Sequence, residues 1–329
     1  MQTTAKILTF FLFIFGIHSL NGQDIHFSQY FNSPLNLNPA QTGNFDGDWR
    51  ITGNYRNQWK ALALPYRTSS VSYDRQIYLK QHHLSAGIVF VNDESGDVRL
   101  KSNQFFLSGA YHRTITNNAL SVGLQIGYST KRVVEMSLPG DWKPSDGVFL
   151  TNPGEHLSYF DVNAGVDWQR KTGIFTPELG VSLFHVNHPK ESFFNDNTRL
   201  PLKSIVHGSL RTNLSDNFYI KPGFFTYIMT GSKDLVLGSE AGYTFQGNQF
   251  QLREARAGFF FRNGITGNSD AMIALFGVQV SNLDVNFSYD FNISPLKTYT
   301  NNRGAFEISF IFKSLSTILK TFTIPCERI

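Results

Sequence analysis

Few residue clusters in this 329-residue chain have the types and spacing of a metal or catalytic site. Residues 92–97 are acidic and polar, but they lack the alternating acidic register and the glutamate at position 12 of an EF-hand calcium loop. His185 and His188 are three residues apart, which in a strand puts them on opposite faces, and the neighbours His82 and His83 are separated in the same way. We therefore expect a solvated loop over 92–97 and no metal site at these histidines.

Hydrolytic chemistry in a barrel wall, as in the outer-membrane phospholipase, would need a serine nucleophile and a histidine base. The chain has serine, histidine and asparagine, but no Gly-x-Ser-x-Gly element, no glycine-rich phosphate loop and no zincin histidine pair. A single cysteine, Cys326, excludes an internal disulfide and, alone, a cysteine-based metal site. The sequence predicts a protein that is not an enzyme and that uses no cofactor.

The elements that would position any site are strands with one apolar and one polar face. In residues 283–291, Leu283, Val285 and Phe287 begin the apolar face, while Asp284 and Asn286 begin the polar one. Soluble sandwich strands are usually shorter, with a mode of about 5–6 residues. Longer strands that are apolar on one side suit a tilted span through a bilayer. The pattern predicts an all-β fold, a transmembrane antiparallel β-barrel.

About fourteen such segments follow one another, an even number as single-chain bacterial barrels require. We place them at 49–57, 67–75, 84–92, 103–115, 119–132, 158–170, 175–188, 201–213, 216–230, 234–244, 255–262, 270–280, 283–292 and 304–313. Pro222 cannot donate to a ladder and predicts a bulge or an end in the ninth segment. Tight turns follow even-numbered segments and the longest connectors follow odd-numbered ones, with 231–233 and 245–254 as exceptions. This parity is typical of outer-membrane barrels, whose periplasmic turns are short.

Composition and the N-terminus suggest where the chain resides. Lys6, the apolar run at 7–17 behind it and the small or polar residues that lead to Gly22 predict a cleaved signal peptide over residues 1–22. The formal net charge of +4 is mild, and no basic run indicates nucleic-acid binding. We expect four parts: the signal peptide, an N-terminal plug or periplasmic segment at 23–48, the barrel at 49–313 and a periplasmic tail at 314–329.

Charged residues on the strands fall on the polar face, which in a barrel is the lumen. This set comprises Arg50, Arg56, Asp74, Asp161, Asp167, Glu178, Glu240, Arg256, Arg262, Asp284, Asp290 and Glu307. Both signs are present, whereas a selective pore more often clusters one sign at a constriction. Two interpretations remain open: internal ion pairs that stabilise the lumen, or a lumen that binds a polypeptide.

The segment before the first strand is neither strand-like nor linker-like. Pro34 and Pro39 restrict the backbone, and Asn36 and Asn38 favour compact turns. Its apolar residues argue against a flexible linker. Such a segment could fold into the lumen as a plug or remain in the periplasm as a docking surface.

This N-terminal block resembles the PorP/SprF family of the Bacteroidetes type IX secretion system. The resemblance rests on Phe27-Ser28-Gln29-Tyr30, on Asn38-Pro39-Ala40 with Gly43, on Tyr55-Arg56-Asn57-Gln58-Trp59, and on Ser70, Ser72 and Asp74. It continues in outline to the C-terminus. Family tails often end in Cys-Pro-Arg, an order that the sequence around Cys326 does not keep, so no role for this cysteine is carried over.

The resemblance implies a non-enzymatic outer-membrane protein that assists export or surface anchoring of a secreted partner, often an adhesin used in gliding motility or attachment. Its expected partners are the C-terminal domain of that cargo, components of the secretion machinery and the lipid bilayer, with no nucleic acid and no small-molecule substrate. The alternative is a passive porin or hydrophobic-ligand channel. We expect partner contacts at Phe27, Tyr30, Asn38, Pro39, Arg50, Arg56, Asp74, Asp161, Arg256 and Arg262.

Overall fold

The computed structural model describes residues 27–58, 66–79, 82–95, 100–133, 156–193, 197–246, 251–264, 268–294 and 303–316. The expected signal peptide, nearly all of the expected tail and most of the 133–157 connector lie outside these residues. No helix in the described ranges is long and apolar enough to cross a membrane.

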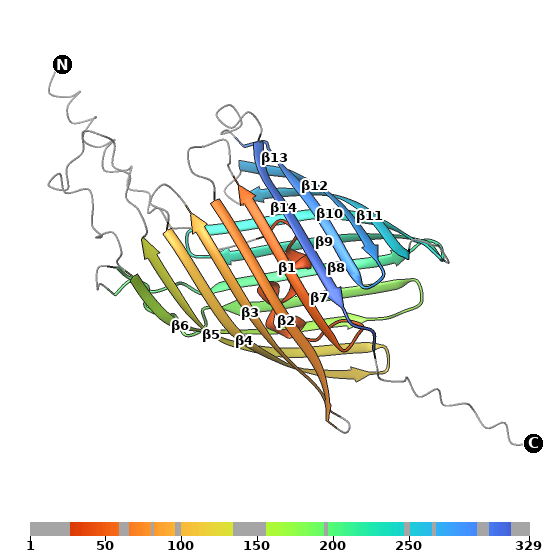
Figure 1. Cartoon of the computed structure of the whole chain (residues 1–329), viewed down its shortest axis with the longest axis horizontal. Coiled ribbons are helices and arrows are strands. Elements are labelled where there is room, and N and C mark those ends of the chain that lie inside the picture. The colour runs from red at the N-terminus through yellow and green to blue at the C-terminus, as the bar shows by residue number, and fades with distance from the viewer. Residues whose placement is uncertain are drawn as a thin grey trace, which may run out of the picture.

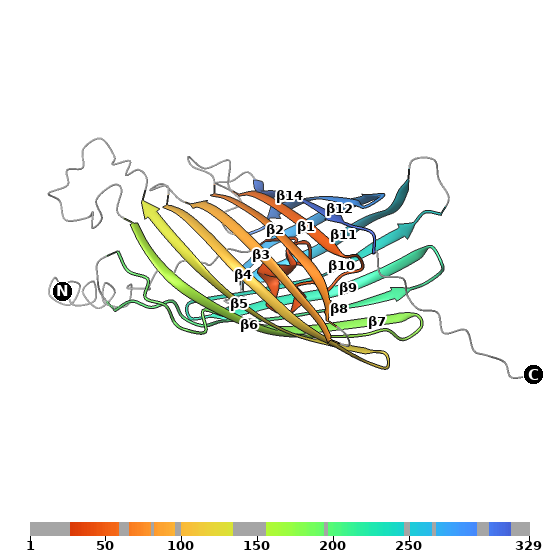
Figure 2. The same cartoon turned by 60° about the horizontal axis from the view of Figure 1, so that its bottom comes forward.

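Fourteen antiparallel strands form a closed barrel, in which β1 pairs with both β2 and β14 (Figures 1 and 2). The strands are β1 (Trp49–Gln58), β2 (Tyr66–Leu79), β3 (His82–Ser95), β4 (Leu100–Ile115), β5 (Asn118–Val133), β6 (His156–Arg170), β7 (Phe175–Phe184), β8 (Lys203–Asn213), β9 (Phe218–Met229), β10 (Ser232–Thr244), β11 (Leu252–Gly264), β12 (Asn268–Val280), β13 (Leu283–Asn292) and β14 (Arg303–Lys313). The fold class and the strand number predicted from the sequence are confirmed.

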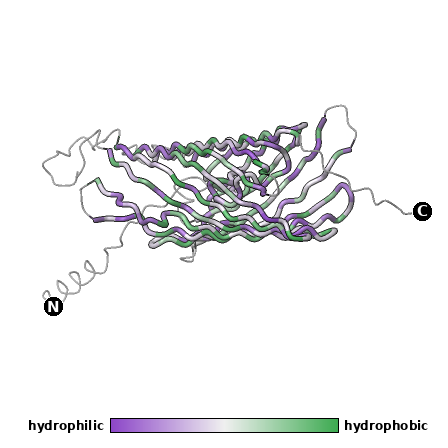
Figure 3. Tube along the Cα trace, turned by 90° about the horizontal axis from the view of Figure 1, so that it is seen from below, coloured by the Kyte–Doolittle hydropathy of each residue, from purple (hydrophilic) through white to green (hydrophobic). Residues whose placement is uncertain are grey.

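Side-chain exposure follows the strand alternation around the wall. On β5, Val122 and Leu124 are 48% and 61% exposed, whereas Ser121 and Gln125 are buried. Apolar and polar residues alternate along the strands in the same way in Figure 3. Because side chains alternate across a strand, one face of the closed sheet is apolar and the other is polar. The apolar face is the outer one, as a lipid-facing wall requires.

Several strand ends differ from the prediction. β7 ends at Phe184 instead of residue 188, because the backbone enters the left-handed region at His185, with φ of 60°, and again at His188, with φ of 45°. β3 runs to Ser95, so residues 92–95 pair with β4 instead of forming the expected loop. Residues 96 and 97 lie outside the described part of the chain.

Pro222 interrupts one ladder without ending the strand. Toward β10 it pairs with Ser239. Toward β8, pairing resumes at Gly223 and Ile220 in an unchanged register, and the residues between them have no partner. The missing amide hydrogen of proline accounts for this gap on one side.

The two ends of the barrel differ in their connectors. The turns 116–117 after β4 and 281–282 after β12 share one end, called here the turn end. The longer connectors 134–155 after β5 and 185–202 after β7 share the other, called the loop end. The short connector 230–231 after β9 and the long one 245–251 after β10 remain exceptions to the parity.

Residues 27–48, called here the plug, lie inside the barrel (Figure 2). They form three short helical turns, η1 (Tyr30–Asn32), α2 (Pro34–Leu37) and η2 (Pro39–Gln41), and join β1 at the turn end. Proline begins both α2 and η2, where its fixed φ suits the first helical position. Of the two placements left open by the sequence, the structure has the luminal one.

Candidate functional site

The contact between plug and wall is the main candidate functional site, and one part of it is ionic. Glu307 accepts hydrogen bonds from the backbone amides of Ser28, at 2.8 Å, and Gln29, at 3.1 Å. The hydroxyl of Ser28 donates to Asp290 at 2.7 Å. Arg56 joins both carboxylates, with distances of 3.0 Å to Asp290 and 3.2 Å to Glu307. Buried carboxylates are thus paired with a buried guanidinium, as charges in a lumen of low dielectric require.

Arg262 completes this group. It lies 3.1 Å from Asp290 and donates to the Ser28 hydroxyl at the same distance. We call Ser28, Arg56, Arg262, Asp290 and Glu307 the ionic cluster. Its members come from the plug, β1, β11, β13 and β14, so it joins distant parts of the barrel to the first plug residues.

A second polar contact holds the other end of the plug. Asp74 accepts from the amide of Gly43 at 2.7 Å and pairs with Arg50 at 2.7 Å. Arg50 also donates to the carbonyl oxygen of Gln41 at 3.0 Å. Gly43 has φ of +70°, and a Cβ there would lie 1.9 Å from the Ser85 hydroxyl oxygen. Glycine is therefore required both by the backbone and by the nearby wall.

Asn38 fixes the centre of the plug. Its side-chain oxygen accepts from the amide of Ala40 at 2.9 Å, and its side-chain nitrogen donates to the carbonyl of Val166 at 3.0 Å. Two wall glycines make room for this contact. A Cβ on Gly165 would lie 1.9 Å from the Asn38 side-chain oxygen, and one on Gly123 would lie 2.3 Å from the Pro39 carbonyl carbon. The sequence Asn-Pro at 38–39 therefore fits a seat shaped by β5 and β6.

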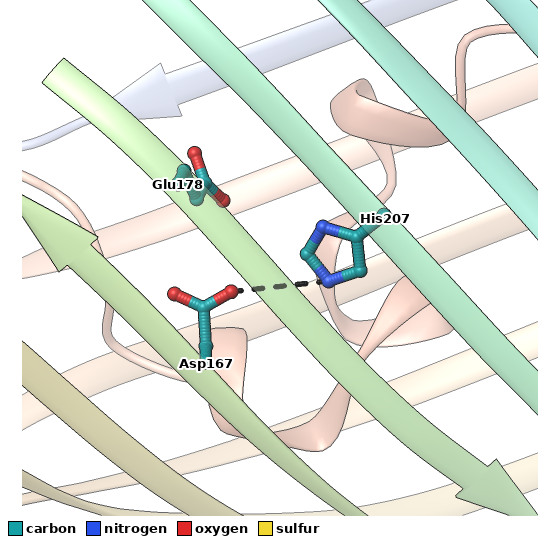
Figure 4. Close-up of side chains that lie close together, drawn as sticks. All are labelled: Asp167, Glu178 and His207. Atoms are coloured by element: carbon teal, nitrogen blue, oxygen red, sulfur yellow. Dashed lines mark ion pairs between the residues drawn. The ribbon is translucent and has the colours of Figure 1, made fainter.

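A cluster of three ionisable side chains lies beside this seat. Asp167 on β6, Glu178 on β7 and His207 on β8 point toward one another (Figure 4). The His207 Nε2 lies 3.8 Å from an Asp167 carboxylate oxygen. Gln41 of the plug donates to Asp167 at 2.9 Å and to Glu178 at 2.8 Å.

The remaining face of the plug is apolar. Tyr30 stacks on Phe225 with ring centroids 5.0 Å apart, and Phe31 lies 5.6 Å from Phe260. Leu37 joins the same cluster, whose wall residues are Phe184, Ile205, Phe225, Tyr227, Met229, Val236, Phe260 and Ile273. This apolar cluster extends over β7 to β12 and faces the lumen, whereas the lumen of an outer-membrane barrel is usually polar.

Two spaces flank the plug. A pocket of about 60 Å³ near the loop end is lined by Phe27, Tyr30, Asp161 and Phe184 among others. A larger cavity of about 300 Å³ toward the turn end is lined mostly by polar and charged residues, including Gln41, Glu178 and His207. We call them the loop-end pocket and the turn-end cavity.

All twelve charged strand residues that the alternation predicted to face the lumen are buried or half-buried. Most of the charged strand residues that contact the plug belong to the ionic cluster or to the contact of Arg50 and Asp74 with the plug. Arg256 instead pairs with Asp284 at 2.6 Å and Glu254 at 3.0 Å. Asp161 lies 2.8 Å from His185 beside the loop-end pocket. The ion-pair interpretation is therefore confirmed for the residues paired above, whereas Asp167 and Glu178 pair with no lysine or arginine among the described residues. Binding of a partner by these residues stays a prediction.

The structure brings together eight of the ten expected partner-binding residues around the plug or within it. Arg256 lies apart from them on the wall, and Asp161 faces Phe27 and Tyr30 across the loop-end pocket. Sequence reasoning missed Gln29, Gln41 and His207 as plug-contacting groups. Gln29 and Gln41 lie within the block that carries the family resemblance, and His207 follows Lys203 and Ile205 on the luminal face of β8. Those signals could have singled them out.

Solved structures similar to this chain are outer-membrane barrels. The Ralstonia pickettii toluene transporter TbuX aligns with a TM-score of 0.51 at 9% identity, covering 86% of this chain and 94% of that one. A deletion mutant of the monoaromatic hydrocarbon channel TodX aligns with a TM-score of 0.51 at 10% identity, covering 85% and 93%. At such identities the likeness shows the fold alone. No curated protein matches the sequence.

Family assignment rests on the sequence as a whole. Residues 19–312 match the family described as "Type IX secretion system membrane protein PorP/SprF". The matched range includes the plug and every strand up to β14, so it covers both the wall and the segment inside it. Together with the closed barrel, this assignment points to the outer membrane. The chain belongs to the PorP/SprF family of type IX secretion system membrane proteins.

Proposed function

We propose that this protein is a non-enzymatic outer-membrane component of type IX secretion that assists export of a secreted partner or anchors it at the cell surface. The family assignment supports a membrane role in that system. The partner would be a secreted protein that engages through its C-terminal domain, for example an adhesin used in gliding or attachment. Components of the secretion machinery would contact the turn end, which by the connector rule faces the periplasm.

The observation that carries this proposal is the plug. Residues 27–48 bond to β1 and β14 through the ionic cluster, to β2 through Asp74, and to β6 and β7 through Asn38 and Gln41. A segment held on several sides leaves the lumen filled, which disfavours free diffusion of solutes. A filled barrel is better suited to binding another protein at its mouth than to passive transport.

Such a partner would dock at the loop end, where it would have to reach a pocket between buried side chains. Phe27, Tyr30 and Asp161 line the loop-end pocket and combine apolar rings with one carboxylate. The other seven expected partner-binding residues would act indirectly: six by holding the plug in place, and Arg256 by supporting the wall.

A crosslinking experiment tests this role. The tagged full-length protein is crosslinked in intact cells, purified from outer membranes and searched by mass spectrometry for exported proteins. We expect recovery of a secreted protein through its C-terminal domain, and a reduced yield from the variant Phe27→Ala. The matched control Phe105→Ala changes a residue on the outward face of β4. Absence of any exported protein from the wild-type sample would contradict the proposal.

A second candidate, a passive porin or hydrophobic-ligand channel, draws support from the apolar loop-end pocket. Planar-bilayer conductance separates the two. Our proposal predicts little steady current through the wild-type protein. A large and steady open pore would favour the channel instead.

A further inference from the structure

The side chains of Asp167, Glu178 and His207 meet in a specific arrangement on three adjacent strands. Asp167 pairs across β6 and β7 with Gly180, which in turn pairs across β7 and β8 with His207. Glu178 lies two residues before Gly180 and therefore on the same face of β7. One potential ligand atom from each side chain lies within 4.8 Å of the other two.

Gly180 gives this row its geometry. A Cβ at this position would lie 2.1 Å from the His207 Nε2 and 2.7 Å from an Asp167 carboxylate oxygen. Because glycine carries no side chain, the imidazole and the carboxylate can approach each other over the middle strand. The wall is thus recessed at the point where the three side chains converge.

Among the described residues, the ion pair of this cluster joins Asp167 to His207, and Arg50, Lys221 and Lys313 line the cavity beside it. Asp167 and His207 are 1% and 4% exposed at their side chains. Across the described ranges, no lysine or arginine forms an ion pair with Asp167 or Glu178, in contrast to the carboxylates of the ionic cluster. A neutral amide, that of Gln41, bridges the two carboxylates instead. Two carboxylates in a buried site are destabilised unless a positive charge accompanies them.

The donor set indicates which positive charge fits. Calcium and magnesium prefer sites made of oxygen atoms alone, whereas an imidazole with carboxylates suits zinc and related transition metals. Three protein ligands leave a fourth position for water or for another side chain. The turn-end cavity borders Glu178, His207 and Gln41, so a hydrated ion has space to reach the cluster.

We propose that Asp167, Glu178 and His207 bind a divalent transition-metal ion, of the zinc class, inside the barrel. The ion takes the position between the carboxylates that the Gln41 amide nitrogen bridges. Turning the Gln41 amide presents its oxygen to the ion, which joins the plug to the wall through the metal. This site is independent of the proposed role in secretion, since it rests only on the luminal geometry.

Zinc binding by the purified full-length protein tests the site. The protein carries a tag without histidine, is held in detergent and is dialysed against zinc ions, and bound metal is measured by mass spectrometry. We expect one zinc ion per chain, and a visible absorption spectrum typical of a mixed nitrogen and oxygen site when cobalt(II) replaces zinc. His207→Gln and Gly180→Ala should both abolish stoichiometric binding, the second because its added Cβ fills the space between the ligands.

His112→Gln is the matched control. His112 is also a buried luminal histidine, but its ring contacts hydroxyl groups of Ser85 and Ser121 and the carbonyl of Thr42. This variant should retain one zinc ion. Heat-induced mobility shifts on gels confirm that each variant is a folded barrel. If Gly180→Ala does not fold, Glu178→Gln, which keeps the side-chain shape, replaces it.

The variant Gln41→Ala distinguishes the contribution of the plug to metal binding from that of the wall ligands. It leaves all three wall ligands in place, so binding should weaken by about 10- to 100-fold without being lost, as for other groups that support a metal site. Wild-type protein that retains no zinc would overturn the proposal. So would one zinc ion per chain that persists in folded His207→Gln and Gly180→Ala.

Discussion

The plug meets two different kinds of wall. On one side, the ionic cluster holds Ser28 through charged and directional contacts, with Arg56 between Asp290 and Glu307. On the other side, the apolar cluster receives Tyr30 and Leu37 among aromatic and aliphatic side chains such as Phe225. The same short segment therefore depends on geometry along β1, β11, β13 and β14 and on volume along β7 to β12, with β11 contributing to both.

This difference predicts different sensitivities. Removing one partner of a buried ion pair leaves an uncompensated charge, whatever the size of the replacement. Apolar packing tolerates substitutions that roughly conserve volume. The charged side should therefore fix the position of the plug, and the apolar side should contribute burial that allows some repacking.

Arg56→Leu should have the largest effect on the plug. It leaves Glu307 without its guanidinium and Asp290 with Arg262 alone, a loss of about 3–5 kcal/mol for a broken buried pair. Hydrogen exchange at the amides of Ser28 and Gln29 should accelerate strongly. Arg113→Leu, on an exposed residue of β4, should leave this exchange unchanged. Equal exchange in the two variants would show that the ionic cluster does not fix the position of the plug.

Leu107→Arg tests whether the outward apolar face meets lipid. Leu107 is half exposed at the middle of β4, where a cationic side chain costs about 2–4 kcal/mol in the bilayer. Assembly into outer membranes, measured by heat-modifiable mobility, should fall. Gln104→Arg on the same strand enters the loop-end pocket instead and should assemble normally. The same reasoning applies to Phe287→Arg and Ile308→Arg. Equal assembly of the variants at 104 and 107 would contradict the assigned faces.

Gly123→Ala should disturb the Asn38 seat by an intermediate amount. The added methyl would lie 2.3 Å from the Pro39 carbonyl carbon, a backbone atom that cannot turn away. Overpacking of this kind costs about 1–3 kcal/mol. Protease sensitivity of the plug should rise. Gly109→Ala makes the same change where the nearest atom would be 3.7 Å away and should have no such effect.

Phe225→Leu should have the smallest effect. Leucine keeps an apolar side chain against Tyr30, although it is smaller and gives up the ring stacking, which is worth about 0.5–1.5 kcal/mol. Hydrogen exchange in the plug should change little, in contrast to Arg56→Leu. A loss on the apolar side as large as that on the charged side would show that both walls position the plug by shape.

Much of the barrel could be predicted from local pattern. Alternation depends only on neighbouring residues, so segments such as 283–292 and the inward placement of Arg56 and Glu307 could be read directly. The strand ends were harder to predict from the sequence. His185 and His188 leave the extended region of the backbone, although nothing in their residue type requires it. The seat of Asn38 depends on Gly123 and Gly165, which are distant in sequence. Likewise, Asp167, Glu178 and His207 meet only because three strands pair in one register.

The most direct test of the account is a disulfide between the plug and the wall. The hydroxyl oxygens of Thr42 and Ser108 lie 2.6 Å apart, so Thr42→Cys with Ser108→Cys, in a Cys326→Ser background, should crosslink in native outer membranes. Ser102 faces the same lumen on β4, six residues or about 20 Å away, and the pair Thr42→Cys with Ser102→Cys should remain reduced. Mass spectrometry of unreduced peptides detects the disulfide-linked peptide of either cysteine pair. A crosslink through Ser108 alone is the predicted result, and no crosslink at Ser108, or equal crosslinking at both positions, would contradict a plug seated in the lumen.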